Sequence, residues 1–449
     1  MNGNEEVQTL HLDWETLYSK PAFVQRVLVS GLKRTKDDII TKNVKPLLQA
    51  ENFGDIVKKA EAVSDRLQQL GIFSRIKIEI DTCKGANAND NGYDVRYVVQ
   101  ESGRLKMGYY TMVGQNDGSL EFNFRSPNVL GRAEEVKLDY IYGTKHTRGF
   151  GLSLKKPLNG NPDTWFGARA YREQGDYPWS GYKETDHGAG LDLSFLSLLG
   201  NHNLRWEGVW RDLRCLSNLS SFRVREQAGH SLKSSLIHTY VRDTRDDMVL
   251  PTRGTLLKMT QEYAGIGGNA NFFKHGVEFQ ANQALPLSSV VQVCLAGGIV
   301  RPLRDTTVNI TDRYFLGGPL TLRGFNKNGI GPHSDGNALG GDVYCMGGLH
   351  LYTPLPFRPG SGGFGELFRS HFFVNAGNCG NVENFSLDQV NKENWKAFQN
   401  SLRLSYGLGV VLRLGSLARL ELNYVLPVWK QAGDSASPGV QLGVGISFL

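Results

Sequence analysis

Apolar and polar side chains alternate along most of the chain after residue 102. In the segment EVKLDYIYG, Leu138 and Tyr140 share a face opposite Lys137 and Asp139. A period of two predicts β-strands with one apolar and one charged face. We mark sixteen segments of this kind, each about 9–15 residues long and bounded by Gly, Asn, Asp or Pro. The region 102–449 is therefore predicted to be all-β.

Two architectures satisfy this pattern. A soluble sandwich or propeller buries the apolar faces between sheets, whereas a transmembrane barrel turns them to lipid and keeps the charges in a wet lumen. Tyrosines and tryptophans near the strand ends are typical of membrane interfaces, and no fixed-period blade signature occurs. No apolar run is long enough for a transmembrane helix. We expect an all-β transmembrane, sixteen-stranded antiparallel β-barrel.

Residues 21–101 combine helical and strand periodicity, unlike the rest of the chain. A strand within Phe23–Leu32 precedes two helical segments, and two alternating strands follow, which predicts a small α+β domain with its own core. Thr35 is expected to cap the first helix. The second helix is expected at Asp55–Leu70, with Gly71 as its C-cap.

Composition and charge narrow the function classes. Lys+Arg 50 against Asp+Glu 44 gives +6 with the basic residues interspersed, so no nucleic-acid partner is expected. The five cysteines are far apart, and no metal-ligand spacing, nucleophile elbow or phosphate loop occurs. We therefore expect free thiols, no metal, no cofactor and no enzymatic activity. The tail 1–20 is acidic and resembles neither a secretory signal nor a cleaved matrix presequence.

The connection Pro302–Gly340 is long for a chain whose other connections are mostly short. It contains DRYFLGGPLTLRGF, Asp312–Phe325, whose clustered aromatic and aliphatic residues are untypical of a disordered loop. In our strand count it joins the eleventh strand, Val290–Val300, to the twelfth, Gly341–Leu351. We expect this loop to be docked against the rest of the protein.

The loop and its surroundings resemble a known family. LRGF at Leu322–Phe325 closely resembles the [VI]RG[FY] motif in the sixth loop of the outer-membrane insertase superfamily, and RYFLGG resembles the lead-in to that motif. Gly71–Ile80 is similar to the strand entry of a polypeptide-transport-associated (POTRA) domain. DTRDDMVLPTRG, Asp243–Gly254, is similar to the turn before the family's ninth strand, and its acids are expected to form side-chain hydrogen bonds rather than a calcium site. The resemblance covers about residues 21–449 and implies one POTRA-like domain before the barrel.

Within the superfamily, one POTRA-like domain and no secretory signal resemble the central barrel subunit of the mitochondrial sorting and assembly machinery. That resemblance implies a protein of the mitochondrial outer membrane that folds and inserts β-barrel precursor proteins, with its POTRA domain facing the intermembrane space. It also implies membrane lipids, metaxin-like subunits and the inner-membrane cristae-organising (MICOS) complex as partners. Two alternatives stay open: a protein-translocating channel of the same superfamily, and a soluble all-β scaffold.

The resemblance also assigns the loop a place. In the family, the sixth loop folds back into the lumen and the motif arginine contacts the inner wall. The candidate loop residues are Arg313, Gly317, Gly318, Leu322, Arg323, Gly324 and Phe325. Members often carry an acid on the thirteenth strand where this chain has Asn375, so Asn375 and another lumen acid such as Glu421 are the candidate partners of the arginine. A role in holding the loop is favoured over direct contact with substrate.

The last strand carries a second candidate site. It resembles a mitochondrial β-signal, and in the family it forms a lateral seam with the first strand, where a precursor strand could add. The candidate seam residues are Gly108, Gln441, Gly443, Gly445, Ile446 and Phe448. The two glycines of the last strand are interpreted either as weakening the seam or as making room for the inserted loop.

Two further segments have broader interpretations. The POTRA-like domain is either a docking spacer, which is slightly favoured, or a module that binds precursors at its strand edges. Asn381–Asn400 is expected to be a loop with one short helix, and no function is assigned to it.

Overall fold

The computed structural model describes residues 18–448, except 85–88, 90, 115–116, 145, 305, 356–363, 382–400, 416–417 and 446–447. The helix predicted in Asn381–Asn400, the seam residue Ile446 and most of the acidic tail therefore lie outside the described residues. The chain divides into two compact units. The first contains the residues up to Met107 together with Phe124–Lys137 and Ser153–Gly167, and the second contains the rest.

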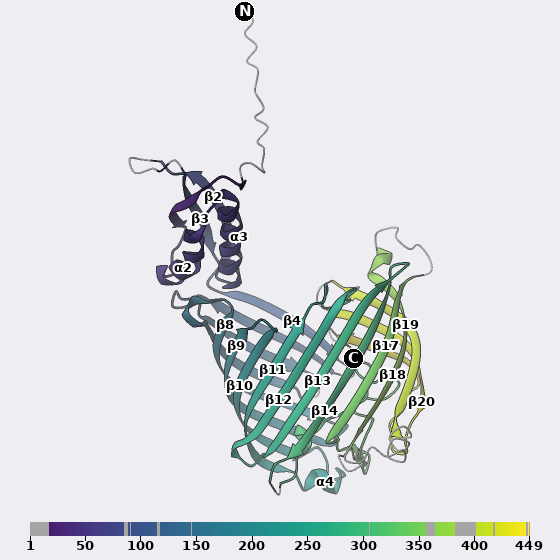
Figure 1. Ribbon diagram of the computed structural model, residues 1–449. Helices are drawn as coiled ribbons and strands as arrows, with labels where there is room; N and C mark the ends of the chain where they lie inside the picture. The colour runs from purple at the N-terminus through teal and green to yellow at the C-terminus, as the bar shows by residue number, and fades with distance from the viewer. Residues whose placement is uncertain are drawn as a thin grey trace, which may run out of the picture. The chain divides into compact units, whose positions relative to one another are not determined.

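The N-terminal part of the first unit is a three-stranded sheet packed against two helices (Figure 1). Its elements are β1 (Phe23–Ser30), α2 (Asp37–Val44), the 3-10 helix η1 (Lys45–Gln49), α3 (Phe53–Gln69), β2 (Phe73–Thr82) and β3 (Gly92–Glu101). The central strand is β3, which runs parallel to β1 and antiparallel to β2. This confirms the predicted order of strand, helix, helix, strand and strand. No helix in the described part of the chain is both long and apolar enough to cross a membrane.

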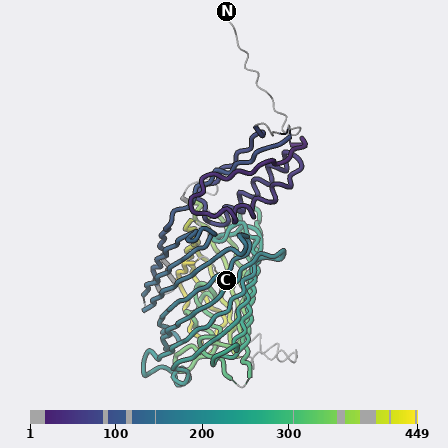
Figure 2. Tube along the Cα trace, turned by 90° about the vertical axis from the view of Figure 1, so that its left-hand side faces the viewer, coloured from purple at the N-terminus to yellow at the C-terminus, as the bar shows by residue number. Residues whose placement is uncertain are grey.

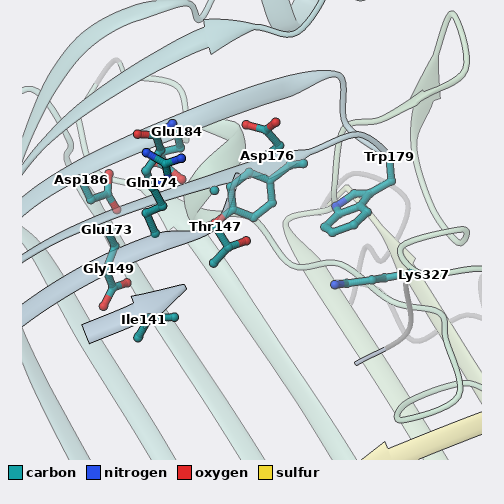
Figure 3. Close-up of a pocket in the computed structure, with 13 residues that line it drawn as sticks. Ile141, Thr147, Gly149, Glu173, Gln174, Asp176, Trp179, Glu184, Asp186 and Lys327 are labelled. Carbon is teal, nitrogen blue, oxygen red and sulfur yellow. The ribbon is translucent and has the colours of Figure 1, made fainter. Parts of the chain in front are cut away.

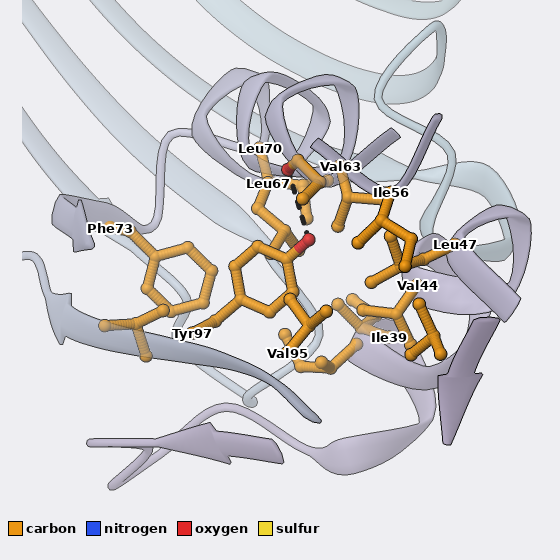
Figure 4. Close-up of a cluster of buried hydrophobic side chains, with 14 of the residues drawn as sticks. Ile39, Val44, Leu47, Ile56, Val63, Leu67, Leu70, Phe73, Val95 and Tyr97 are labelled. Carbon is orange, nitrogen blue, oxygen red and sulfur yellow. Dashed lines mark hydrogen bonds between the residues drawn. The ribbon is translucent and has the colours of Figure 1, made fainter. Parts of the chain in front are cut away.

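Apolar residues at helical spacing on α3 build the core of this part. Ile56, Ala60 and Leu67 lie on one face of the helix and are buried against the sheet (Figure 4). Tyr97 of β3 is buried among them, and its hydroxyl donates to the Ala60 carbonyl at 3.1 Å. This hydrogen bond offsets the cost of removing the hydroxyl from water. Gly71 adopts a φ of +72° directly after the helix, as expected of a C-cap.

The helix cap expected at Thr35 is wrong. Helix α2 begins at Asp37 without a side-chain cap. The Thr35 hydroxyl instead donates at 2.7 Å to the carboxylate of Glu101, which also accepts the Arg34 amide at 2.9 Å. An ionised carboxylate is a strong acceptor, so it draws the hydroxyl away from the helix. Burial alone would favour the protonated acid, but these hydrogen bonds hold the pKa of Glu101 down at about 2.

Sixteen strands form one sheet, in which neighbours along the chain are neighbours in space. They are β4 (Lys106–Gly114), β5 (Asp117–Pro127), β6 (Glu135–Gly143), β7 (Arg148–Pro157), β8 (Thr164–Tyr177), β9 (Tyr182–Leu196), β10 (Asn201–Cys215), β11 (Gly229–Asp243), β12 (Gly254–Gly268), β13 (Phe272–Leu285), β14 (Ser289–Pro302), β17 (Val343–Pro354), β18 (Phe368–Gly380), β19 (Arg403–Leu414), β20 (Ala418–Trp429) and β21 (Gly439–Gly445). Figures 1 and 2 show these strands running obliquely around the wall of a barrel. The predicted sixteen-stranded antiparallel sheet is confirmed.

The wall has an apolar outer face and a polar inner face. On β10, Trp206 and Trp210 are 41% and 56% exposed, whereas Glu207 and Arg211, which alternate with them, are buried. Large apolar residues are exposed on strand after strand in the same way. A continuous apolar outer surface with polar residues inside is typical of a transmembrane barrel. The lumen therefore holds the charged groups that position the long loop.

Candidate functional site

The connection between β14 and β17 packs inside the barrel. Its only regular elements are η3 (Ile310–Asp312) and a hairpin of β15 (His333–Ser334) and β16 (Asn337–Ala338) within the described residues. Leu316, Leu322 and Phe325 are at most 1% exposed and form a cluster with residues of β14, β17 and β18. Burying each such side chain stabilises the docked loop by about 1.5–3 kcal/mol. The loop is therefore docked, as its composition predicted.

Arg323 of the loop lies beside Glu421 of β20, and both side chains are fully buried. The Arg323 Nη2 and Nε groups donate to Glu421 Oε2 at 2.8 and 3.2 Å. The guanidinium carbon lies 5.1 Å from the ring centre of Phe373 and 5.6 Å from that of Phe448, within cation–π range. Of the two candidate partners, Glu421 provides the opposite charge. Removing Glu421 would leave the buried guanidinium of Arg323 without its counter-charge.

A second arginine, which sequence analysis did not identify, shares this carboxylate. Arg419 places its Nε 3.0 Å from Glu421 Oε1, and the Asn423 amide donates to Oε2 at 3.0 Å. The guanidinium of Arg419 also lies 4.3 Å from the ring centre of Phe448. One carboxylate thus faces two guanidinium groups. The alternation in RLELN was the available signal, because it places residues 419, 421 and 423 on one face.

The loop motif is also hydrogen-bonded to the last strand. The Gly324 amide donates to Gln441 Oε1 on β21 at 2.9 Å, and the Gln441 side chain donates to the Phe325 carbonyl at 3.4 Å. Gly324 has a φ of +88°, and a Cβ added there would lie 3.1 Å from Val425 Cγ1. Both the left-handed backbone and the close wall therefore favour glycine. The motif connects the interior loop directly to β21.

The other candidate residues of the loop contribute to its shape. Asn375 of β18 is buried and donates to a backbone carbonyl of the loop at 3.2 Å. Arg313 donates to the Val308 carbonyl at 3.3 Å, a hydrogen bond between two residues of the loop that stabilises the conformation of its first part. Gly317 and Gly318 have φ values of +116° and +121°, so they provide a turn that other residues rarely adopt.

A second ionic anchor lies at the start of the loop. Asp312 accepts two hydrogen bonds from Arg211 of β10, Nη1 to Oδ2 at 2.7 Å and Nη2 to Oδ1 at 3.0 Å. Lys274 of β13 donates to the Asp312 backbone carbonyl at 2.8 Å and lies over the Tyr314 ring at 4.4 Å. A bidentate pair of this kind fixes orientation as well as distance. Sequence analysis quoted Asp312 but gave it no role, because its partner is about a hundred residues away.

Beside the loop lies a cavity of about 190 Å³ (Figure 3). The acidic residues that line it are Glu173, Asp176, Glu184 and Asp186. Lys327, from the loop, also lines the cavity and lies over the ring of Trp179, with 4.1 Å from Nζ to the ring centre. A cationic side chain of the loop thus faces an acidic part of the lumen, which adds a favourable long-range term to the docking.

The two edge strands of the sheet are β4 and β21. Within the described residues, β21 pairs with β20 from Gly439 to Gly445. On β4, a Cβ added to Gly108 would lie 3.0 Å from Asn123 Oδ1 of the neighbouring strand. An edge strand presents N–H and C=O groups that can pair with another chain.

Gly443 of β21 lies close to the loop. A Cβ added at this position would lie 3.0 Å from Phe448 Cε1 and 3.3 Å from Pro319 Cβ. Phe448 is buried, and its ring is the one that contacts both arginines around Glu421. The steric interpretation of the last-strand glycines therefore has direct structural support at Gly443.

The turn before β12 is held by its own side chains, as predicted. Asp246 Oδ1 accepts the amides of Thr252 and Arg253 at 2.9 and 3.1 Å. The tip of this turn reaches the buried cluster, because the Val249 carbonyl accepts a hydrogen bond from Arg419 Nη1 at 3.2 Å. Two connections, this turn and the long loop, thus meet around Glu421.

Known proteins resemble this chain over most of its length. Residues 128–448 match the model of the Omp85 superfamily domain. The chain is 48% identical over 436 residues to the sorting and assembly machinery component 50 homolog of Bos taurus, which covers 97% of this chain and 92% of that protein. It is 34% identical over 438 residues to the SAM50-like protein CG7639 of Drosophila melanogaster, which covers 95% of each. Among solved structures, BamA from Haemophilus ducreyi lacking POTRA domains 1–3 has a TM-score of 0.75 at 19% identity, covering 94% of this chain and 84% of that one.

Proposed function

The chain belongs to the Omp85 superfamily, and from that premise we propose that it folds and inserts β-barrel precursors into the mitochondrial outer membrane. The observation that carries the proposal is the position of the LRGF loop. Arg323 is paired with Glu421 inside the barrel, while the adjacent Gly324 is hydrogen-bonded to Gln441 on the edge strand β21. The names of the relatives, components of a sorting and assembly machinery, support the same process.

We propose that the work is done at a lateral seam between β4 and β21. A precursor strand would pair with the unpaired backbone groups of an edge strand, by β-augmentation, and would need no covalent chemistry. Gly443 and Gly445 of β21 lack side chains that could support pairing with β4, which favours separation of the two strands. The docked loop would hold β21 through Gln441 while the rest of the lumen keeps its packing.

We also propose that the N-terminal α+β part, residues 21–101, is a POTRA domain that faces the intermembrane space. In this role it serves as a docking spacer, and precursor binding at the sheet edges β1 and β2 is the alternative. Metaxin-like subunits of the same machinery and the MICOS complex are the proposed protein partners.

The test uses isolated mitochondria in which this chain is the sole copy. A freshly translated barrel precursor is imported, and its conversion to the protease-resistant form is compared between the native chain and Arg323→Ala. The matched variant is Arg301→Ala, an exposed arginine at the end of β14. A helix-anchored outer-membrane protein serves as the second control.

We expect Arg323→Ala to block barrel maturation at normal protein abundance, with Arg301→Ala and the helix-anchored protein unaffected. Normal maturation in the Arg323→Ala mitochondria, followed by normal maturation after depletion of the whole protein, would contradict the insertase proposal. In that case the protein-translocating channel becomes the better account. A channel function would require the loop to leave the lumen. The channel would be recognised in planar bilayers by a voltage-gated conductance that presequence peptides block.

A further inference from the structure

Basic side chains gather on the outer face of β8–β11. A cavity of about 400 Å³ lies there, within the size range of small-molecule sites. Its lining residues include Arg172, Lys183, His187, Trp210, Arg214 and His230. The helix α4 (Phe222–Arg225) belongs to the connection between β10 and β11. The lining residues Arg214 of β10 and His230 of β11 lie at the ends of these strands that adjoin this connection.

Strand pairing forces like charges together in this cavity. Arg214 of β10 lies directly opposite Lys183 of β9 on the same face, an arrangement that is destabilising without a counter-charge. Asp212 pairs with Arg214, whose Nε and Nη2 lie 2.8 and 2.7 Å from its Oδ2, and its Oδ1 lies 3.7 Å from His230 Nδ1. Across the described residues, no carboxylate lies within ion-pair distance of Arg172 or Lys183. Three permanent cations therefore face one carboxylate, and the cavity favours an anion.

The position of the cavity indicates what kind of anion. Strands β9, β10 and β11 each have fifteen residues, whereas about 9–11 suffice to cross a bilayer. The basic residues occupy the end of these strands, and the outer face beyond them continues with exposed Leu191, Trp206 and Leu236. Trp210 lies between the two zones and packs edge-on against His230, with ring centres 5.7 Å apart. Tryptophan at such a boundary is typical of the membrane interface.

We propose that this outer cavity binds the phosphate headgroup of an anionic phospholipid. Arg172 and Lys183 contact the phosphate, and the phosphate relieves the repulsion between Lys183 and Arg214. The acyl chains run over the exposed apolar residues farther along the strands, a contact that a free phosphate or an acidic protein would not use. The site lies outside the loop and the seam, so it does not depend on the proposed insertase function.

The test titrates a fluorescent phosphatidic acid into the full-length protein in neutral detergent and follows the anisotropy. The variant Arg172→Gln/Lys183→Gln removes the two unpaired cations and keeps the pair between Arg214 and Asp212. The matched control is Arg242→Gln/Arg301→Gln, which removes two exposed arginines elsewhere on the outer face. A charge-preserving variant, Arg172→Lys/Lys183→Arg, tests whether loss of binding reflects loss of charge.

We expect the Arg172→Gln/Lys183→Gln variant to bind about thirtyfold more weakly, since one cation near an anionic surface contributes about fivefold. The matched control and the charge-preserving variant should stay within about twofold of the native protein by the same reasoning. Equal weakening in the matched control would overturn the proposal. Unchanged binding in the Arg172→Gln/Lys183→Gln variant would also overturn it. Displacement of the lipid by equimolar inorganic phosphate would assign the site to free phosphate, and tighter binding of poly-glutamate would assign it to an acidic protein. Either result would also overturn it.

Discussion

Because Arg323 and Arg419 share the carboxylate of Glu421, we expect Glu421→Gln to destabilise the protein more than Arg323→Gln does. In Glu421→Gln, the buried guanidinium groups of Arg323 and Arg419 both lose their counter-charge, although Asn423 and the aromatic rings remain. In Arg323→Gln, Glu421 still has Arg419 at 3.0 Å. The cluster therefore tolerates loss of the loop arginine better than loss of the acid.

The magnitudes follow from the burial of the groups. Leaving buried charge uncompensated costs about 3–5 kcal/mol, so the free energy of unfolding should fall by that amount in Glu421→Gln. Arg323→Gln loses charge-assisted hydrogen bonds but leaves no isolated charge, which corresponds to about 1.5–3 kcal/mol. The double variant should cost less than the sum, with a coupling of about 1 kcal/mol or more.

The assay is urea unfolding of the full-length protein in lipid vesicles, followed by tryptophan fluorescence. Glu226→Gln, an exposed acid at the end of α4, is the control and should leave the midpoint unchanged. Comparison of midpoints is valid only where the slope with urea is the same for all variants. A cost for Arg323→Gln equal to or greater than that for Glu421→Gln, or strict additivity in the double variant, would refute the shared-carboxylate account.

Three further results are expected. Gly324→Ala should loosen the loop by about 1–2 kcal/mol because its φ is +88°, and protease sensitivity of the loop would show this. Asp312→Asn should release the bidentate contact to Arg211 and expose the start of the loop to protease. The control Asp335→Asn, on the β15–β16 turn, should not increase cleavage, and equal cleavage in both variants would contradict the role of Asp312 as an anchor of the loop. The pKa of Glu101 is lowered to about 2 in the folded domain, so its stabilising contribution is present above its unfolded pKa and is lost as pH falls toward 2. Hydrogen exchange of β3 in the full chain should show this loss, and Glu101→Gln should remove it.

The strands were readable from the sequence because one structural cause dominates them. Because one face of each strand meets lipid and the other meets the polar lumen, apolar and polar residues alternate with a period of two. A segment such as the one containing Leu138 and Tyr140 can therefore be recognised as a strand from its own sequence. The helix α3 was readable for the same reason, since its buried residues Ile56, Ala60 and Leu67 recur at helical spacing. The error at Thr35 arose because a carboxylate distant in sequence, Glu101, competes for the hydroxyl that a local rule assigns to the helix.

The candidate site was only partly readable. The motif identified Arg323, and strand alternation made Glu421 a candidate, but the second guanidinium at Arg419 depends on how two strands and a loop meet in the lumen. The pair of Asp312 with Arg211 is similarly non-local. Single-sequence patterns describe which face a residue occupies, not which residue faces it across the barrel.

The most direct test of the central claim is a cross-link between β21 and a precursor arrested during insertion. A photoreactive amino acid replaces Val440, an exposed residue on the outer face of β21, and in a matched chain it replaces Leu295, an exposed residue on β14. The account predicts that a strand of the precursor cross-links to position 440 and not to position 295. Equal cross-linking at both positions, or maturation of the precursor without any cross-link at position 440, would contradict insertion at the β4–β21 seam.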